Sequence, residues 1–120
     1  MSRPHPLTCT RVVDGGTASV AVTGDLAYDT GDVLLHTVVD ALEEGGVEDV
    51  RIDFAGLELC DSYGLATLLM IHRRVVAAGA RLHLENRPTT LERLMRRTNT
   101  LGHLTSTPAA DRMDRLDRFD

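Results

Sequence analysis

The spacing of apolar residues changes period several times along this chain, and this change is the feature that most restricts its fold. Segments in which apolar and polar residues alternate have the period of a β-strand, whereas apolar residues three or four positions apart have the period of a helix. After an opening pair of strand-like segments, the two kinds of segment follow one another in turn. This order predicts an α/β domain in which most strands pair in parallel through right-handed crossovers.

Two segments rich in Thr and Val open the chain. They cover residues 7–13 and 17–23 and flank Asp14-Gly15-Gly16, a sequence typical of a tight turn. Such a pattern indicates two antiparallel strands joined as a hairpin. The expected fold is therefore a mixed sheet that opens with an antiparallel hairpin and continues with mainly parallel strands alternating with about four helices.

The later elements follow from apolar periodicity and from capping signals. Asp61 fits an N-cap position, and Thr89 followed by Glu92 matches a capping box. In order, we expect a helix over 32–44, a strand over 50–54 that ends near Ala55-Gly56, a helix from about 64 to 78, a strand over 81–85, a helix opened by Thr89, and a short strand over 101–107. Residues 111–120 form either a short closing helix or a frayed, charged terminus.

The length of the chain indicates one domain, because 120 residues can bury a core without disulfides or metals. We expect a single domain over residues 1–120, with its core over about 7–107 and a charged tail or short helix over 108–120. The sequence has no signal-peptide pattern and no apolar stretch near the roughly 20 residues that span a membrane. We therefore expect a soluble, cytoplasmic protein with no membrane partner.

Composition excludes several functional classes. A net charge of −5 argues against direct nucleic-acid binding, which depends on Lys and Arg neutralising phosphates. Aromatic residues make up 3% of the chain and no Walker or GxGxxG sequence occurs, so we expect no cofactor. Cys9 and Cys60 lack metal-ligand spacing and the histidines form no HxH or HExxH pattern. We therefore expect no metal site and two reduced cysteines.

The segments that follow parallel strands gather at the carboxyl edge of a sheet, where open α/β sheets place their sites. In this chain those segments are Gly24–Leu26, Leu59–Ser62 and Glu85–Arg87. We expect this rim to hold the functional residues.

Ser62 is the strongest candidate on the rim. A serine in the first turn of a helix lies where amide groups and the helix dipole favour a phosphate. Phosphorylation would add negative charge beside Asp61 and repel a partner docked there. The alternative is that Ser62 only shares the capping of the helix with Asp61.

The helix that follows Ser62 contains more apolar residues than one face requires. Leu65, Leu68, Leu69 and His72 can fill the core stripe, while Thr67, Met70 and Ile71 lie on other faces. Two interpretations are open. Part of the apolar surface is exposed and binds a protein, or the helix is central and buried nearly all round.

A hydrolase is a further hypothesis, because Cys60-Asp61-Ser62-Tyr63-Gly64 follows a strand and opens a helix, as a nucleophile elbow does. The G-x-S-x-G pattern requires glycine two positions before the serine, and Cys60 stands there instead. No glycine-rich oxyanion loop is visible either. We therefore expect a binding protein rather than an enzyme, and no Ser62-dependent turnover of an activated ester.

Two stretches resemble the STAS domains of bacterial anti-sigma factor antagonists. They are Gly24-Asp25-Leu26 and Leu59-Cys60-Asp61-Ser62-Tyr63-Gly64-Leu65, and the resemblance runs from about Leu7 to the end of the last expected strand. It implies a STAS-like fold. It also implies that the unphosphorylated protein binds an anti-sigma factor that is a serine kinase, and so regulates sigma-factor-dependent transcription.

The resemblance further implies roles for single residues. The kinase would phosphorylate Ser62 and release the antagonist, and a metal-dependent serine phosphatase would restore it. Asp61 would shape the phosphorylation site, Gly64 would keep the helix start open, and Asp25 would be a partner-facing loop residue. With Tyr63, these residues form the expected partner-binding set.

Two departures from the family pattern affect the partner contact. Tyr63 stands where the family often has a second Ser or Thr, and its bulk can alter kinase access. Ala27 stands where the family often has Asp. The alternative within the same fold is a STAS scaffold or an accessory subunit, for instance of a lipid transport system, in which Ser62 is never modified.

Overall fold

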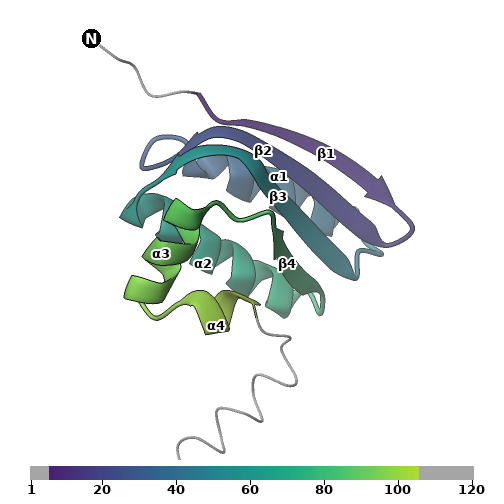
Figure 1. Cartoon of the computed structure of the whole chain (residues 1–120). Coiled ribbons are helices and arrows are strands. Elements are labelled where there is room, and N and C mark those ends of the chain that lie inside the picture. The colour runs from purple at the N-terminus through teal and green to yellow at the C-terminus, as the bar shows by residue number, and fades with distance from the viewer. Residues whose placement is uncertain (1–5, 106–120) are drawn as a thin grey trace, which may run out of the picture.

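The computed structural model describes residues 6–105 of the chain, and Figure 1 shows their arrangement. The elements are, in order, β1 (Thr8–Asp14), β2 (Thr17–Leu26), α1 (Gly31–Glu43), β3 (Asp49–Cys60), α2 (Ser62–Ala77), β4 (Arg81–Glu85), α3 (Thr89–Arg97) and α4 (Leu101–Thr105). The predicted opening hairpin and the succession of strands and helices after it are confirmed.

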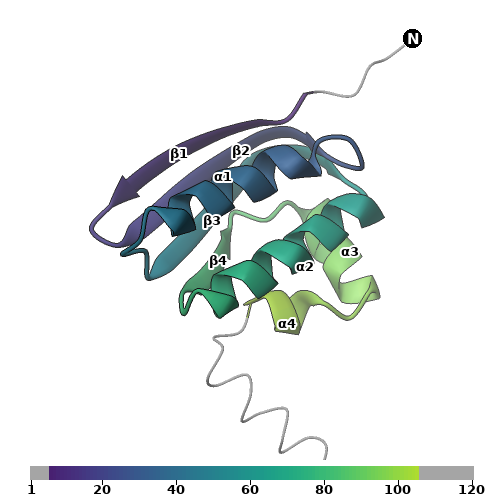
Figure 2. The same ribbon diagram turned by 180° about the vertical axis from the view of Figure 1, so that it is seen from behind.

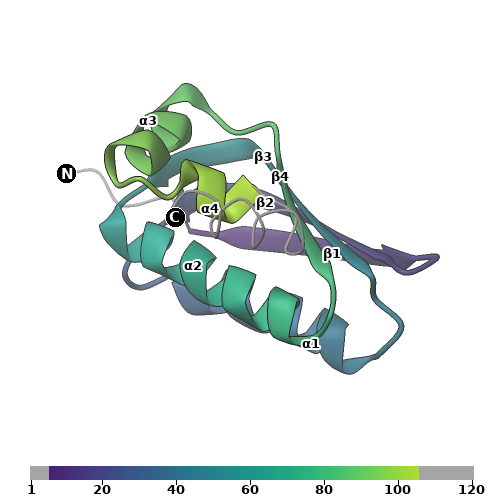
Figure 3. The same ribbon diagram turned by 90° about the horizontal axis from the view of Figure 1, so that it is seen from below.

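The four strands form one sheet in the order β1-β2-β3-β4. β1 pairs with β2 in the antiparallel sense, and β2–β3 and β3–β4 pair in parallel. The helices α1 and α2 lie side by side on one face of the sheet (Figure 2). α3 contacts β3, and α4 contacts the edge strand β4 (Figure 3). The expected mixed sheet is therefore the observed one.

The core lies between the sheet and the helices α1 and α2. Alternate residues of β2 and β3 point toward them, as the period of a strand requires. Among the largest fully buried side chains are Val20 and Val22 of β2, Ile52 and Phe54 of β3, Leu34 and Val38 of α1, and Leu68 and Ile71 of α2. Each such side chain stabilises the fold by about 1.5–3 kcal/mol through burial.

The central strands run further than the sequence pattern predicts. β2 continues through Gly24, Asp25 and Leu26, which were expected in a loop, and β3 continues past Gly56 to Cys60. Their pairing continues to Leu26 opposite Cys60, with two register shifts on the way. The shifts break the strict alternation of buried and exposed residues, so the far ends of the strands do not have a strand-like pattern.

The two later helices begin differently from the prediction. α2 begins at Ser62 with Asp61 as its N-cap, as expected, two residues earlier than predicted. The capping box at Thr89 is wrong, because Pro88 holds the N-cap position of α3 and no side chain caps it. Glu92 instead forms ion pairs with Arg87 and Arg96.

Residues 101–105 form the short helix α4 rather than the predicted strand. After α3, Asn99 adopts a positive φ of 65° and the Thr100 N–H donates to the Met95 carbonyl at 2.8 Å, so the chain turns back sharply. Leu104 is then buried against the core. A run this short has no periodicity that separates helix from strand. The predicted residues 106 and 107 of that strand, and the alternatives for 108–120, lie outside the described residues.

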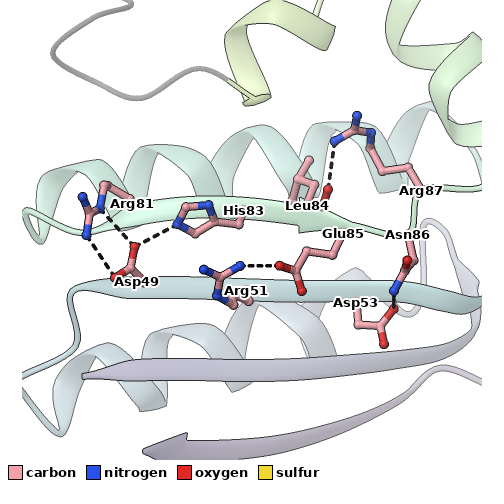
Figure 4. A network of polar contacts seen from close by, with 9 residues as sticks. All are labelled: Asp49, Arg51, Asp53, Arg81, His83, Leu84, Glu85, Asn86 and Arg87. Carbon is pink, nitrogen blue, oxygen red and sulfur yellow. Dashed lines mark hydrogen bonds and ion pairs between the residues drawn. The ribbon is translucent and has the colours of Figure 1, made fainter. Parts of the chain in front are cut away.

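A network of polar side chains joins β3 to β4 (Figure 4). Asp49 accepts hydrogen bonds from Arg81 and lies 2.8 Å from the Nε2 atom of His83. Arg51 pairs with Glu85. The hydrogen bonds from His83 and, second, from Arg81 hold the pKa of Asp49 below its usual range.

Asp53 anchors the end of β4 in the same network. Its carboxylate accepts hydrogen bonds from the Asn86 side chain and the Ala55 N–H, both at 2.9 Å, and these lower its pKa. The short strand β4 is thus joined to β3 by side chains as well as by backbone pairing.

Candidate functional site

The ends of β2 and β3 bring two predicted stretches together. Leu26 and Cys60 are register partners, and the Asp61 N–H donates to the Leu26 carbonyl at 3.3 Å. α2 starts at the next residue, so Ser62 lies at the carboxyl edge of the two central strands. The rim that the topology predicts therefore exists at β2 and β3.

The third predicted stretch of the rim lies elsewhere. β4 ends at Glu85, opposite Asp53, whereas β3 continues for seven further residues to Cys60. At about 3.3 Å per residue, Glu85 is roughly 20 Å short of Cys60 along the strand direction. The expectation that all three segments share one site is wrong, because the strands differ in length.

Asp61 alone supplies the side-chain cap of α2. Its backbone is extended, and its Oδ1 atom accepts a hydrogen bond from the Gly64 N–H at 2.8 Å. Ser62 is the first helical residue, its side chain is exposed, and it makes no hydrogen bond within the described part of the chain. The capping alternative for Ser62 is therefore not supported, and its hydroxyl group faces solvent.

Gly64 permits the close approach of α2 to the end of β2. A Cβ atom at this position would lie 2.3 Å from the Leu26 carbonyl oxygen and 3.0 Å from the Cys60 sulfur. The first distance is shorter than any real Cβ contact, and the atom it involves belongs to the backbone; the second is a tight contact. The small residue expected here is thus required by packing, and it fixes where Ser62 stands.

Asp25 is not the partner-facing loop residue that the resemblance implies. It lies within β2, and only 5% of its surface is exposed. Its carbonyl accepts a hydrogen bond from the Thr30 hydroxyl at 2.7 Å, and the same hydroxyl accepts one from the Ala27 N–H at 2.9 Å. Hydrogen bonds within the segment therefore hold the turn between β2 and α1. The burial of Asp25 suits a structural role.

Two tyrosines meet at the start of α2. Tyr28, from the segment after β2, and Tyr63, from the first turn of α2, meet edge to face with ring centroids 5.2 Å apart. They are 77% and 60% exposed, and Leu59 at the end of β3 is 51% exposed. Sequence reasoning missed Tyr28. The signal was present, since two of the four aromatic residues of the chain follow the ends of paired strands.

Cys60 lies immediately beneath this surface. Burial and the charge of Asp61 raise the pKa of its thiol to about 12. A thiol with such a pKa is almost wholly protonated at neutral pH and is a poor nucleophile. Both Cys60 and Cys9 are free thiols, as predicted.

The outward side of α2 is partly apolar. Ile71, expected on an outer face, is fully buried, while Met70 is 51% exposed. Leu69 and His72 are half-buried. The result lies between the two alternatives, because most of the helix is covered and one flexible apolar side chain remains at the surface.

Other polar groups lie apart from Ser62. His83 pairs with Asp49, and His72 contacts His103 with ring centroids 4.5 Å apart. Within residues 6–105, no cluster of three or more His, Cys, Asp or Glu side chains is arranged to hold a metal ion. No helix in this range is both long and apolar enough to cross a membrane.

The fold and the site together define a class of protein. It has a mixed sheet opened by a hairpin, two helices on one face, and an exposed serine at the start of the helix that follows the third strand. The family model described as "Mlab, STAS domain" matches residues 9–105. The chain therefore belongs to the STAS-domain family, and the predicted family is confirmed.

Solved structures show the same fold. An anti-sigma factor antagonist from Mycobacterium paratuberculosis is 18% identical, with 95% of this chain and 97% of that chain covered and a TM-score of 0.72. The Bacillus cell fate determinant SpoIIAA in its phosphorylated form is 21% identical, with 92% and 98% covered and a TM-score of 0.63.

A sulfate transporter family protein from Wolinella succinogenes is 20% identical, with 78% of this chain and 75% of that chain covered and a TM-score of 0.66. The fold therefore occurs in antagonists and in transporter proteins alike. A comparison with curated protein sequences gives no match.

Proposed function

We propose that this chain is an anti-sigma factor antagonist that acts as a single STAS domain in the cytoplasm. Unphosphorylated, it binds an anti-sigma factor that is also a serine kinase and so frees a sigma factor for transcription. Phosphorylation of Ser62 by that kinase ends the binding, and a serine phosphatase restores it. The observation that carries the proposal is the solvent-facing Ser62 hydroxyl, which opens α2 without serving as its cap.

The surroundings of Ser62 suit a surface that binds a protein. Tyr28, Tyr63 and Leu59 expose large side chains around the start of α2. Aromatic residues are enriched among those that dominate binding energy at protein interfaces. Asp61 and Gly64 fix the start of α2, so Ser62 is presented in one position.

The chemistry of phosphorylation fits a switch at this position. A phosphate on Ser62 would lie at the N-terminal end of α2, where the helix dipole favours an anion. The same group adds about −1.5 to −2 charge next to Asp61 in the chain, at the surface that exposes Tyr28, Tyr63 and Leu59. The fold of the chain would tolerate the modification while an apolar or acidic partner surface would not.

The proposal is tested by measuring binding to the anti-sigma kinases encoded in the same genome. Ser62→Asp is expected to weaken binding at least tenfold, about 1.4 kcal/mol, whereas Ser62→Ala keeps the affinity within a few-fold. Ser19→Asp is the matched control, because Ser19 is an exposed serine on β2. It should bind as the wild type does.

The scaffold hypothesis predicts a different result. If the chain binds a partner stably and Ser62→Asp changes the affinity no more than Ser19→Asp does, the switch is excluded. A constitutive subunit role, of the kind suggested by the shared fold of a transporter protein, would then hold.

A further inference from the structure

The outward face of α3 is strongly basic. Leu91 and Met95 are buried on the inner side of this helix, and Thr90, Arg93 and Arg97 stand three and four positions apart on the other side. Residues 87–97 contain four arginines and one glutamate, although the chain as a whole has a net charge of −5. Three of these arginines lie on α3 and Arg87 lies just before it, so positive charge is concentrated on one short segment.

Two depressions lie on this face. One has a volume of about 410 Å³ and is lined by Thr90, Arg93, Arg96 and Arg97. The other has a volume of about 300 Å³ and is lined by Thr89, Glu92, Arg93 and Arg96. Arg93 and Arg96 line both, so the two depressions adjoin, and each is large enough for a small ligand.

The positive charge is only partly neutralised within the protein. The Glu92 carboxylate is shared between Arg87 at 3.7 Å and Arg96 at 3.4 Å. The side chains of Arg93 and Arg97 make no ion pair or hydrogen bond within residues 6–105. Two guanidinium groups at the larger depression therefore have all their donors available.

Helix electrostatics does not account for the whole cluster. Arg96 and Arg97 lie in the last turn of α3, where cations stabilise the free carbonyl groups. Arg93 lies in the middle of the helix, where this effect has faded, and yet it lines both depressions. The position of Arg93 at both depressions is therefore not explained by stabilisation of the helix end.

We propose that this face of α3 binds phosphate-type oxyanions carried by a small molecule. Guanidinium groups present planar, bidentate donors that match phosphate oxygens, and the Thr90 hydroxyl adds a further donor. The described lining contains no aromatic and no large apolar side chain. The site therefore recognises the anionic group itself and not a base or an acyl chain.

A titration with inorganic pyrophosphate at low ionic strength tests this proposal on the full-length protein. We expect the amide NMR signals of α3 to shift in a saturable manner, and the affinity to fall as salt screens the charges. Arg93→Gln combined with Arg97→Gln should weaken binding at least about tenfold, because each removes charge-assisted hydrogen bonds.

The matched control is Arg73→Gln combined with Arg74→Gln. These two arginines are exposed on α2, and their side chains make no contact of this kind within the described residues. The control removes the same charge and should bind pyrophosphate as the wild type does. Unshifted α3 signals at millimolar pyrophosphate, or equal losses in the two double variants, would overturn the proposal.

Vesicles distinguish the two sources of such an anion. If the ligand is a small soluble molecule, vesicles of phosphatidylglycerol and phosphatidylcholine should bind the protein no more than vesicles of phosphatidylcholine alone. Co-flotation with the anionic vesicles that is lost in the Arg93/Arg97 variant would place the phosphate on a lipid headgroup and overturn the assignment to a small molecule.

Discussion

Gly64 fixes the distance between the first turn of α2 and the end of β2. A Cβ atom there would come within 2.3 Å of the Leu26 carbonyl oxygen, and a backbone atom cannot move aside as a flexible side chain does. Ser62, two residues earlier, is positioned by this contact and by the cap from Asp61. The placement of Ser62 thus depends on a neighbour that has no side chain.

Gly64→Ala should therefore destabilise the protein. We expect the free energy of unfolding to fall by about 1–3 kcal/mol, the usual cost of overpacking, in urea denaturation followed by circular dichroism. Gly102→Ala is the control, since a Cβ atom at Gly102 of α4 would meet no atom within 4 Å. A Gly64→Ala variant as stable as the control would contradict the close packing described above.

At the scale of elements, charged side chains reinforce the backbone pairing of β3 with β4. Asp49 accepts hydrogen bonds from Arg81 and contacts His83, and these hold its pKa below the usual value in the folded state. The unfolded state therefore binds more protons as the pH falls through the ordinary value. The stability that Asp49 contributes is present above about pH 4 and is lost toward lower pH.

Asp49→Asn should flatten the acid side of the stability profile. We expect the variant to be less stable than the wild type near neutral pH and to lose less stability between about pH 5 and pH 3, because one low-pKa carboxylate is gone. Urea denaturation at a series of pH values measures both effects. Asp40→Asn, on the exposed side of α1, controls for the loss of one negative charge. An unchanged acid slope in Asp49→Asn would refute this account of the network.

The elements with clear periodicity were predictable from the sequence, and those fixed by tertiary contacts were not. β4 was predicted at its observed bounds, because Leu82 and Leu84 alternate cleanly with polar residues. The end of β3 was missed because register shifts interrupt its alternation, although its pairing with β2 continues. α4 was taken for a strand because five residues with one buried leucine carry no period.

At the scale of the whole molecule, topology predicted where Ser62 lies, and the unequal lengths of β3 and β4 separate Ser62 from the end of β4. Ser62 and Asp61 were predicted as a helix start at the carboxyl edge, and they lie there beside the end of β2. The burial of Asp25 and the contact of Tyr28 with Tyr63 were beyond the sequence, because both depend on how far β2 and β3 run together. Local motifs located the serine, and tertiary structure supplied its surroundings.

The most direct test of the central claim is the intact mass of the protein before and after incubation with ATP and the candidate anti-sigma kinases of its own genome. The account predicts that one kinase adds a single phosphate group to the wild type and none to Ser62→Ala. If Ser62→Ala binds the same kinase but stays unmodified, the missing phosphate reflects the missing hydroxyl group and not a failure to form the complex. A stable complex in which the wild type is never phosphorylated, or a phosphate that persists in Ser62→Ala, would contradict the account.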